Sequence, residues 1–172
     1  MANRNHVMNT RPRIRIEPTP TDIVVEIAAV AAVVFCVYVT ARFYPELPQR
    51  MPTHSNLVGK VDGWGPKSSL VGMPILTLVL YLALSAVSRF PHIGNYPVEV
   101  TAENAERIYW VAVSMSRWLK MEMLWMFAYM TWMTIQVSLG KAKDPGAAPM
   151  YAILAVILGT LILMIVRLYR AK

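Results

Sequence analysis

Four nearly uncharged, apolar blocks recur along this chain of 172 residues. They cover residues 23–40, 70–87, 121–139 and 150–166. Each approaches the roughly 20 residues that a helix needs to cross the hydrocarbon core of a bilayer. Because lipid offers no partners to backbone polar groups, unbroken segments of this kind must be helical. The pattern predicts an all-α integral membrane four-helix bundle over residues 23–172, preceded by a flexible cytoplasmic leader over residues 1–22.

The third block extends backwards into the connection at residues 88–120. Ala105, Ile108, Tyr109, Ala112 and Met115 recur there at helical spacing. The pattern continues without a break into the apolar block, which predicts one long third helix from about residue 102 to 139. At 1.5 Å per residue it would measure roughly 57 Å, more than the bilayer core. We therefore expect its first half to project into the cytoplasm or to lie along the interface.

Composition and charge agree with a membrane protein. Hydrophobic residues make up 56% of the chain and charged residues 16%, whereas a soluble domain is about a quarter charged. Eleven basic residues fall on the side of the termini (Arg4, Arg11, Arg13, Arg15, Arg89, Arg107, Arg117, Lys120, Arg167, Arg170, Lys172) and six on the other (Arg42, Arg50, Lys60, Lys67, Lys141, Lys143). This asymmetry predicts a bacterial plasma (inner) membrane protein with both termini in the cytoplasm. The basic leader is expected to meet lipid headgroups and not nucleic acid.

The chain lacks the common sequence signatures of catalysis and cofactor binding. It contains no glycine-rich phosphate loop, zinc-protease motif or nucleophile elbow. Its single cysteine, Cys36, lies in the first apolar block, so it can form neither an internal disulfide nor a cysteine-based metal site. We therefore predict a protein that is not an enzyme and that needs no cofactor.

The outer connection at residues 44–67 concentrates residue types that a random loop seldom combines. It carries a Leu-Pro pair followed by a spaced set of polar residues and glycines: Leu47, Pro48, Pro52, His54, Asn56, Gly59, Asp62, Gly65 and Lys67. This pattern resembles the hallmark of the family called domain of unknown function 1648. Residues 95–107 resemble a second stretch found in single-domain members of that family.

The resemblance implies a small multi-span bacterial membrane protein, and most members of the family have no assigned activity. A related branch with more spans includes an immunity protein against a sporulation-delaying toxin. An immunity-like role is thus an analogy that rests on the shared loop.

The outer loop allows a structural and a functional interpretation. In the structural one, Pro48 and Pro52 fix an extended approach, Gly59 and Gly65 permit tight turns, and Trp64 lies at the interface. In the functional one, four polar side chains converge on an outward-facing pocket for a peptide or a lipid headgroup: His54, Asn56, Asp62 and Lys67. A metal site is not predicted, because one histidine and one aspartate fall short of the usual three or four ligands.

Two acids and an aromatic stripe lie within or beside the apolar blocks. Glu26 and Glu122 are expected near the inner interface, where they can reach water or pair with a base. The third helix carries a stripe of aromatic and methionine side chains that predicts a surface for helix packing or for a partner: Trp118, Trp125, Met126, Tyr129, Met130 and Trp132.

Three hypotheses for function follow. The first is a non-enzymatic binding, sensory or immunity-like module whose outer loop recognises a peptide or lipid. The second is an accessory structural subunit that docks on other membrane protein subunits through its helices. The third, a metal-dependent enzyme using His54 and Asp62, has the least support.

Overall fold

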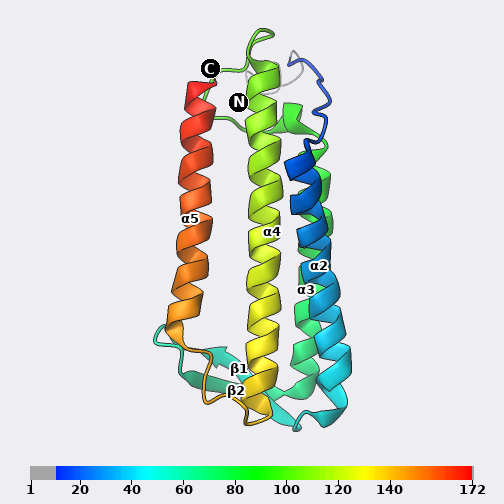
Figure 1. The fold of residues 1–172 in the computed structure, drawn as a ribbon, viewed down its shortest axis with the longest axis vertical. Coiled ribbons are helices and arrows are strands. Elements are labelled where there is room, and N and C mark those ends of the chain that lie inside the picture. The colour runs from blue at the N-terminus through cyan, green and yellow to red at the C-terminus, as the bar shows by residue number, and fades with distance from the viewer. Residues whose placement is uncertain (1–10, 172) are drawn as a thin grey trace, which may run out of the picture.

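Four long helices lie side by side in this computed structural model, which describes residues 11–171 (Figure 1). They are α2 (Pro20–Phe43), α3 (Gly72–Ser88), α4 (Ala105–Ser138) and α5 (Ala147–Arg170). The shorter elements are the 3-10 turns η1 (Tyr44–Glu46), η2 (Lys67–Val71) and η3 (Pro91–Ile93) and the strands β1 (Arg50–Ser55) and β2 (Val61–Pro66). Helix α2 begins and α5 ends at one end of the molecule, and the two strands lie at the opposite end.

Three stretches are long and apolar enough to cross a membrane. They run over Pro20–Glu46, Lys67–Ser88 and Ala148–Arg170, and so correspond to α2, α3 and α5. Their side chains face mainly outwards, since only 11% of the apolar window in α3 and 6% of that in α5 is buried. So large an exposed apolar surface is unfavourable in water and favourable against lipid. The chain is therefore a membrane protein.

Helix α4 is not among these three stretches, although the sequence predicted four spans. It lies in the centre of the helices and contacts α2, α3 and α5 (Figure 1). A helix surrounded by protein can carry Trp, Tyr and Thr side chains where a helix facing lipid carries aliphatic ones. Its 34 residues confirm one long third helix, roughly 51 Å in length.

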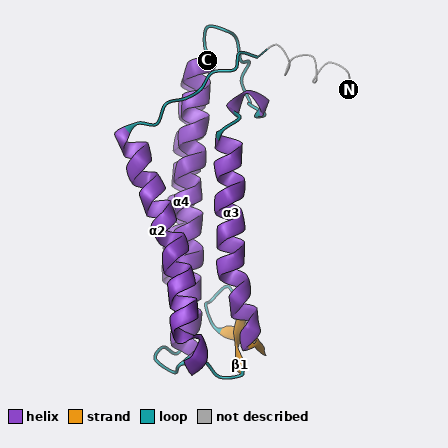
Figure 2. Cartoon of the chain, turned by 90° about the vertical axis from the view of Figure 1, so that its right-hand side faces the viewer, coloured by secondary structure: helices purple, strands orange, loops and turns teal. Residues whose placement is uncertain are grey.

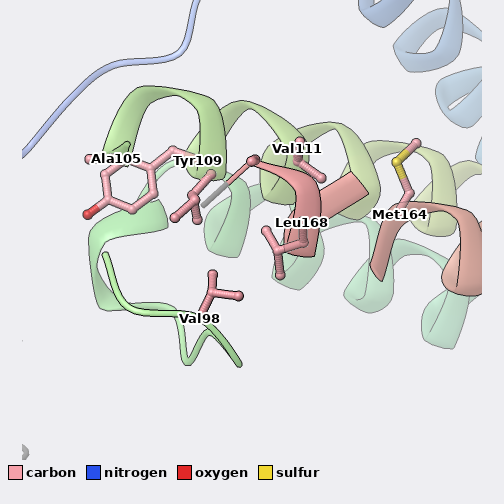
Figure 3. Close-up of a cluster of buried hydrophobic side chains, with 8 residues drawn as sticks. Val98, Ala105, Tyr109, Val111, Met164 and Leu168 are labelled. Carbon is pink, nitrogen blue, oxygen red and sulfur yellow. The ribbon is translucent and has the colours of Figure 1, made fainter. Parts of the chain in front are cut away.

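The first half of α4 does not stand alone. An apolar cluster joins its first turns to the end of α5 and to the connection that follows η3 (Figure 3): Val98, Ala105, Tyr109, Val111, Met164 and Leu168. Ile14 and Ile16 pack against the same cluster. The end of the molecule opposite the strands is thus a packed layer and not a single projecting helix.

Helix α2 begins three residues before the apolar block that predicted it. Thr19 and Asp22 form a reciprocal capping box, and Pro20 occupies the first turn, where its missing N–H is not needed. The predicted boundary at residue 22 consequently falls inside the helix. Helices α2 and α3 both lie to the right of α4 in Figure 1, and in the view from that side they flank it (Figure 2). Arg4 and Lys172, which contributed to the predicted orientation, lie outside the described residues.

The prediction of an all-α protein was wrong at the outer loop, which forms an antiparallel hairpin of β1 and β2. The sequence did not indicate these strands, because they contain prolines and glycines, which are rare inside strands. Gly63 and Gly65 allow the close approach: a Cβ there would lie 2.8 Å from the Cβ of His54 and 2.7 Å from the Cγ2 of Thr53. Met51, which is 1% exposed, anchors the hairpin in an apolar cluster with side chains from α2 and α4.

Candidate functional site

The tip of the hairpin is organised by Asn56. Its Oδ1 accepts hydrogen bonds from the backbone N–H groups of Val58 (3.1 Å) and Lys60 (3.0 Å). The backbone of Asn56 also bonds to Lys60 and Gly59. Gly59 has φ +79°, a left-handed conformation that glycine adopts without strain. Of the four predicted ligand-binding residues, Asn56 therefore has a structural role in the turn.

His54 and Asp62 meet across the two strands. The His54 Nδ1 and the Asp62 Oδ1 form a hydrogen-bonded pair, although the two residues are eight positions apart in the sequence. Both side chains remain open to the surroundings, with 71% and 43% of their surface exposed. The pair can present either a donor or an acceptor to a ligand, because the histidine ring has a second nitrogen.

Lys67 does not join this pair. Its Nζ lies 4.8 Å from the centre of the Tyr44 ring, in a cation–π contact at the foot of the hairpin. Trp64 lies opposite Pro52 in the hairpin register and is 55% exposed, and Pro48 precedes β1. The structure thus pairs His54 with Asp62, keeps Asn56 beside them in the turn, and places Lys67 apart at the foot of the hairpin.

A pocket of about 360 Å³ lies behind the hairpin, and we call it the outer pocket. Its walls come from β1 and the turn, from the last part of α4, and from the first turn of α5. His54 and Asn56 lie on its polar side, and three methionines and two tyrosines lie on its apolar side: Met130, Met133, Met150, Tyr129 and Tyr151. Pro52 and Gly59 also line it.

The α4–α5 loop and the first turn of α5 contact the hairpin tip beside the outer pocket. Tyr151 Oη donates to the carbonyl of Leu57 (2.8 Å), and Tyr129 Oη donates to the carbonyl of Pro145 (3.2 Å). Gly59 lies so close to this loop that a Cβ on it would fall 2.4 Å from the carbonyl carbon of Gly146. Sequence reasoning missed Met133, Met150 and Tyr151 as lining residues, since no local pattern shows that residues 145–151 fold onto the hairpin.

The aromatic and methionine stripe of α4 is divided between contacts within the chain and the walls of two cavities. Trp132 lies against Phe35 and Phe43, with ring centroids 6.2 and 5.8 Å apart. Trp125 Nε1 donates to the carbonyl of Ala28 (3.1 Å). Tyr129 and Met130 line the outer pocket, and Trp118 lines a second cavity near the other end of α4.

Two ion pairs join α2 to α4 in the half of the molecule away from the hairpin. Lys120 Nζ lies 2.7 Å from Glu26 Oε2, and Arg117 Nη1 lies 2.8 Å from Asp22 Oδ2. The base expected beside Glu26 is therefore Lys120. Glu122 instead accepts a hydrogen bond from the Thr160 hydroxyl of α5 (2.6 Å). Within residues 11–171, no group of three or more His, Cys, Asp or Glu side chains is placed to hold a metal ion.

Residues 31–78 match the family described as Domain of unknown function (DUF1648). The match runs from within α2 through the hairpin into α3, and it confirms the resemblance based on the loop motif. The stretch at residues 95–107 lies outside the match, and the likeness to an immunity protein has no further support. No curated protein and no solved structure matches the chain.

Replacing Asn56 with alanine should open the hairpin turn. The change removes the acceptor of two backbone hydrogen bonds, each worth about 1 kcal/mol. We expect tryptic cleavage after Lys60 to rise several-fold in vesicles that expose the hairpin. Asn56→Asp keeps a side-chain oxygen at the same place and should be cleaved as slowly as the wild type. Equal cleavage of all three proteins would show that Asn56 does not hold the turn.

Proposed function

We propose that this chain is a non-enzymatic binding module of a bacterial inner membrane that captures an apolar peptide segment in its outer pocket. The central helix α4 then crosses the bilayer as a fourth span, with both termini in the cytoplasm. The excess of basic residues on the side of the termini supports this orientation. The observation that carries the proposal is the outer pocket of about 360 Å³ formed by the family-specific hairpin and the α4–α5 loop.

The chemistry of the outer pocket favours an apolar ligand with one polar end. Methionine side chains are flexible and polarisable, so they adapt to varied apolar partners. Met130, Met133 and Met150 supply this surface, while the His54–Asp62 pair and Asn56 lie at the hairpin side. The ligand would therefore place apolar side chains between α4 and α5 and a polar group near His54.

The hairpin also favours a peptide over other apolar ligands. It is a two-stranded sheet, so each strand has one edge without a strand partner. An extended peptide can add to such an edge through main-chain hydrogen bonds, while pockets select its side chains. Residues 52–57, which include most of β1, line the outer pocket. A sensory or immunity-like role would be one use of such capture.

Site-specific photocrosslinking tests this proposal in native membranes. Leu57 lines the outer pocket and is 84% exposed, so a benzophenone amino acid placed there would not fill the pocket. Its neighbour Val58 is 66% exposed and does not line the pocket, which makes it the matched control. We expect a discrete peptide adduct at position 57, no such adduct at position 58, and loss of the adduct when Thr134→Trp fills the pocket.

The other outcomes of the crosslinking distinguish the alternatives. Lipid adducts alone, in equal amounts at both positions, would overturn the peptide proposal. A stoichiometric adduct with a large membrane subunit, insensitive to Thr134→Trp, would instead favour the accessory-subunit hypothesis. Sizing the protein in mild detergent then shows whether it belongs to a larger assembly.

A further inference from the structure

The seam between α4 and α5 contains a second cavity near the end of the molecule opposite the hairpin. This inner cavity has a volume of about 440 Å³. Trp110, Ser114 and Trp118 of α4 form one wall, and Thr160 and Arg167 lie on the α5 wall. Thr19, Thr21 and Asp22 at the start of α2 complete it. The inner cavity thus extends from the charged end of the helices to Thr160.

Glu122 lies immediately beyond the inner cavity. It follows Trp118 by four residues, which places both on the same face of α4. Glu122 is 9% exposed, and its Oε1 accepts the hydrogen bond from the Thr160 hydroxyl. Its Oε2 is buried and has no hydrogen-bond partner among the described residues. The carboxyl group is therefore held by one neutral hydroxyl.

The bases near Glu122 are engaged elsewhere. Arg117 pairs with Asp22, and Lys120 pairs with Glu26, which also accepts a hydrogen bond from Tyr81 of α3. Helix α3 has no charged residue between Gly72 and Ser88, and the first basic residue of α5 is Arg167. Arg167 lies two turns beyond Thr160, roughly 10 Å along the helix.

A buried carboxylate without a positive partner is costly, so the group must gain a proton or a cation. The access route decides which of the two it gains. Glu122 does not line the inner cavity, whereas Thr160 does, so only the hydroxyl of Thr160 connects the carboxyl group to that space. A hydroxyl can relay a proton but cannot pass a metal ion or an organic cation.

We propose that Glu122 holds an exchangeable proton that enters from the inner cavity through the Thr160 hydroxyl. A hydronium ion in the cavity gives a proton to Thr160 Oγ1 and remains as water, while the original Oγ1–H proton transfers to Glu122 Oε1. The carboxylate becomes a neutral carboxylic acid, and Thr160 ends unchanged. The outer pocket begins at Tyr129, about 10 Å further along α4, so the proton reaches Glu122 from one side only.

Infrared spectroscopy of the protein in phosphatidylethanolamine and phosphatidylglycerol vesicles tests this directly. A protonated carboxyl group has a carbonyl stretch that an ionised one lacks. At neutral pH we expect this band in the wild type and in Glu46→Gln, a control at an exposed acid paired with Arg42. The band should be absent in Glu122→Gln, which keeps the shape and the hydrogen bond to Thr160. No band at any pH between about 5 and 9, or a band that persists in Glu122→Gln, would overturn the proposal.

The route through Thr160 has its own measurement. On transfer to deuterated buffer the carbonyl band shifts as the carboxyl proton exchanges. Thr160→Val removes the hydroxyl at nearly constant volume and should slow this exchange several-fold, whereas Thr160→Ser should restore it. Equal exchange rates in all three proteins would refute a relay through Thr160. These experiments do not depend on the outer pocket or on a ligand there.

Discussion

Replacing Glu26 with leucine is expected to lower the free energy of unfolding by about 3–5 kcal/mol, because it leaves a buried charge without its partner. The Lys120 side chain is 2% exposed, and its ammonium group donates to both carboxylate oxygens of Glu26 and to Ser85 Oγ. The Tyr81 ring lies 4.7 Å away. Among the described residues, the Ser85 hydroxyl and the Tyr81 ring would then be left to stabilise the positive charge. Denaturation of the purified protein in mixed micelles, followed by tryptophan fluorescence, measures the change.

The double variant Glu26→Leu/Lys120→Met separates the cost of an unpaired charge from the value of the pair. Buried ion pairs can often be exchanged for apolar side chains of similar size with little loss of stability. We therefore expect the double variant to recover most of what Glu26→Leu loses. If the double variant is as unstable as Glu26→Leu, the loss comes from packing at position 26 and not from Lys120.

Gly59→Ala is expected to separate the hairpin tip from the α4–α5 loop. Two contributions destabilise the folded state of this variant, one from the backbone conformation and one from steric overlap. A left-handed backbone at φ +79° costs an L-residue about 1–2 kcal/mol. The new Cβ would also lie 2.4 Å from the carbonyl carbon of Gly146 and 2.5 Å from the nitrogen of Ala147, and backbone atoms cannot rotate away. Overpacking of this kind costs typically about 1–3 kcal/mol more.

Two other glycines serve as matched controls, because each isolates one contribution. Gly140 has φ +69° but no atom within 4 Å of an added Cβ, so Gly140→Ala should show the backbone cost alone. Gly72 is helical and equally open, so Gly72→Ala should leave stability unchanged or slightly raised. Thermal unfolding and tryptic cleavage after Lys60 compare the three. The close approach of the loop to the hairpin is refuted if Gly59→Ala costs no more than Gly140→Ala.

Gly59→Ala also bears on the proposed function. Gly59, Gly146 and Ala147 all line the outer pocket, so separating them should alter that pocket while the helices remain packed. A folded Gly59→Ala protein that no longer forms the peptide adduct at position 57 would support capture by the outer pocket. Retention of the adduct would show that the ligand binds without the loop.

The sequence by itself determined where the helices lie and that three of them, α2, α3 and α5, are apolar enough to face lipid. Apolar blocks near the length of a bilayer span leave the backbone one way to satisfy its hydrogen bonds. The continuous pattern from Ala105 onwards likewise predicted one long helix, because helical periodicity is a local property. The family motif could also be recognised in the sequence, because a motif consists of particular residues in a particular order.

Tertiary structure decided which residues meet. Pairing in the hairpin brought His54 to Asp62 but sent Lys67 to Tyr44, because strand register depends on bulges and close glycine contacts and not on spacing. The central position of α4, between α2, α3 and α5, accounts for its lower hydropathy and for the pairing of Lys120 with Glu26. The packing of α5 against α4 left Glu122 beside Thr160, between two cavities. These contacts join residues from 8 to 94 positions apart, at spacings that no local pattern specifies, so only the packed chain determines them.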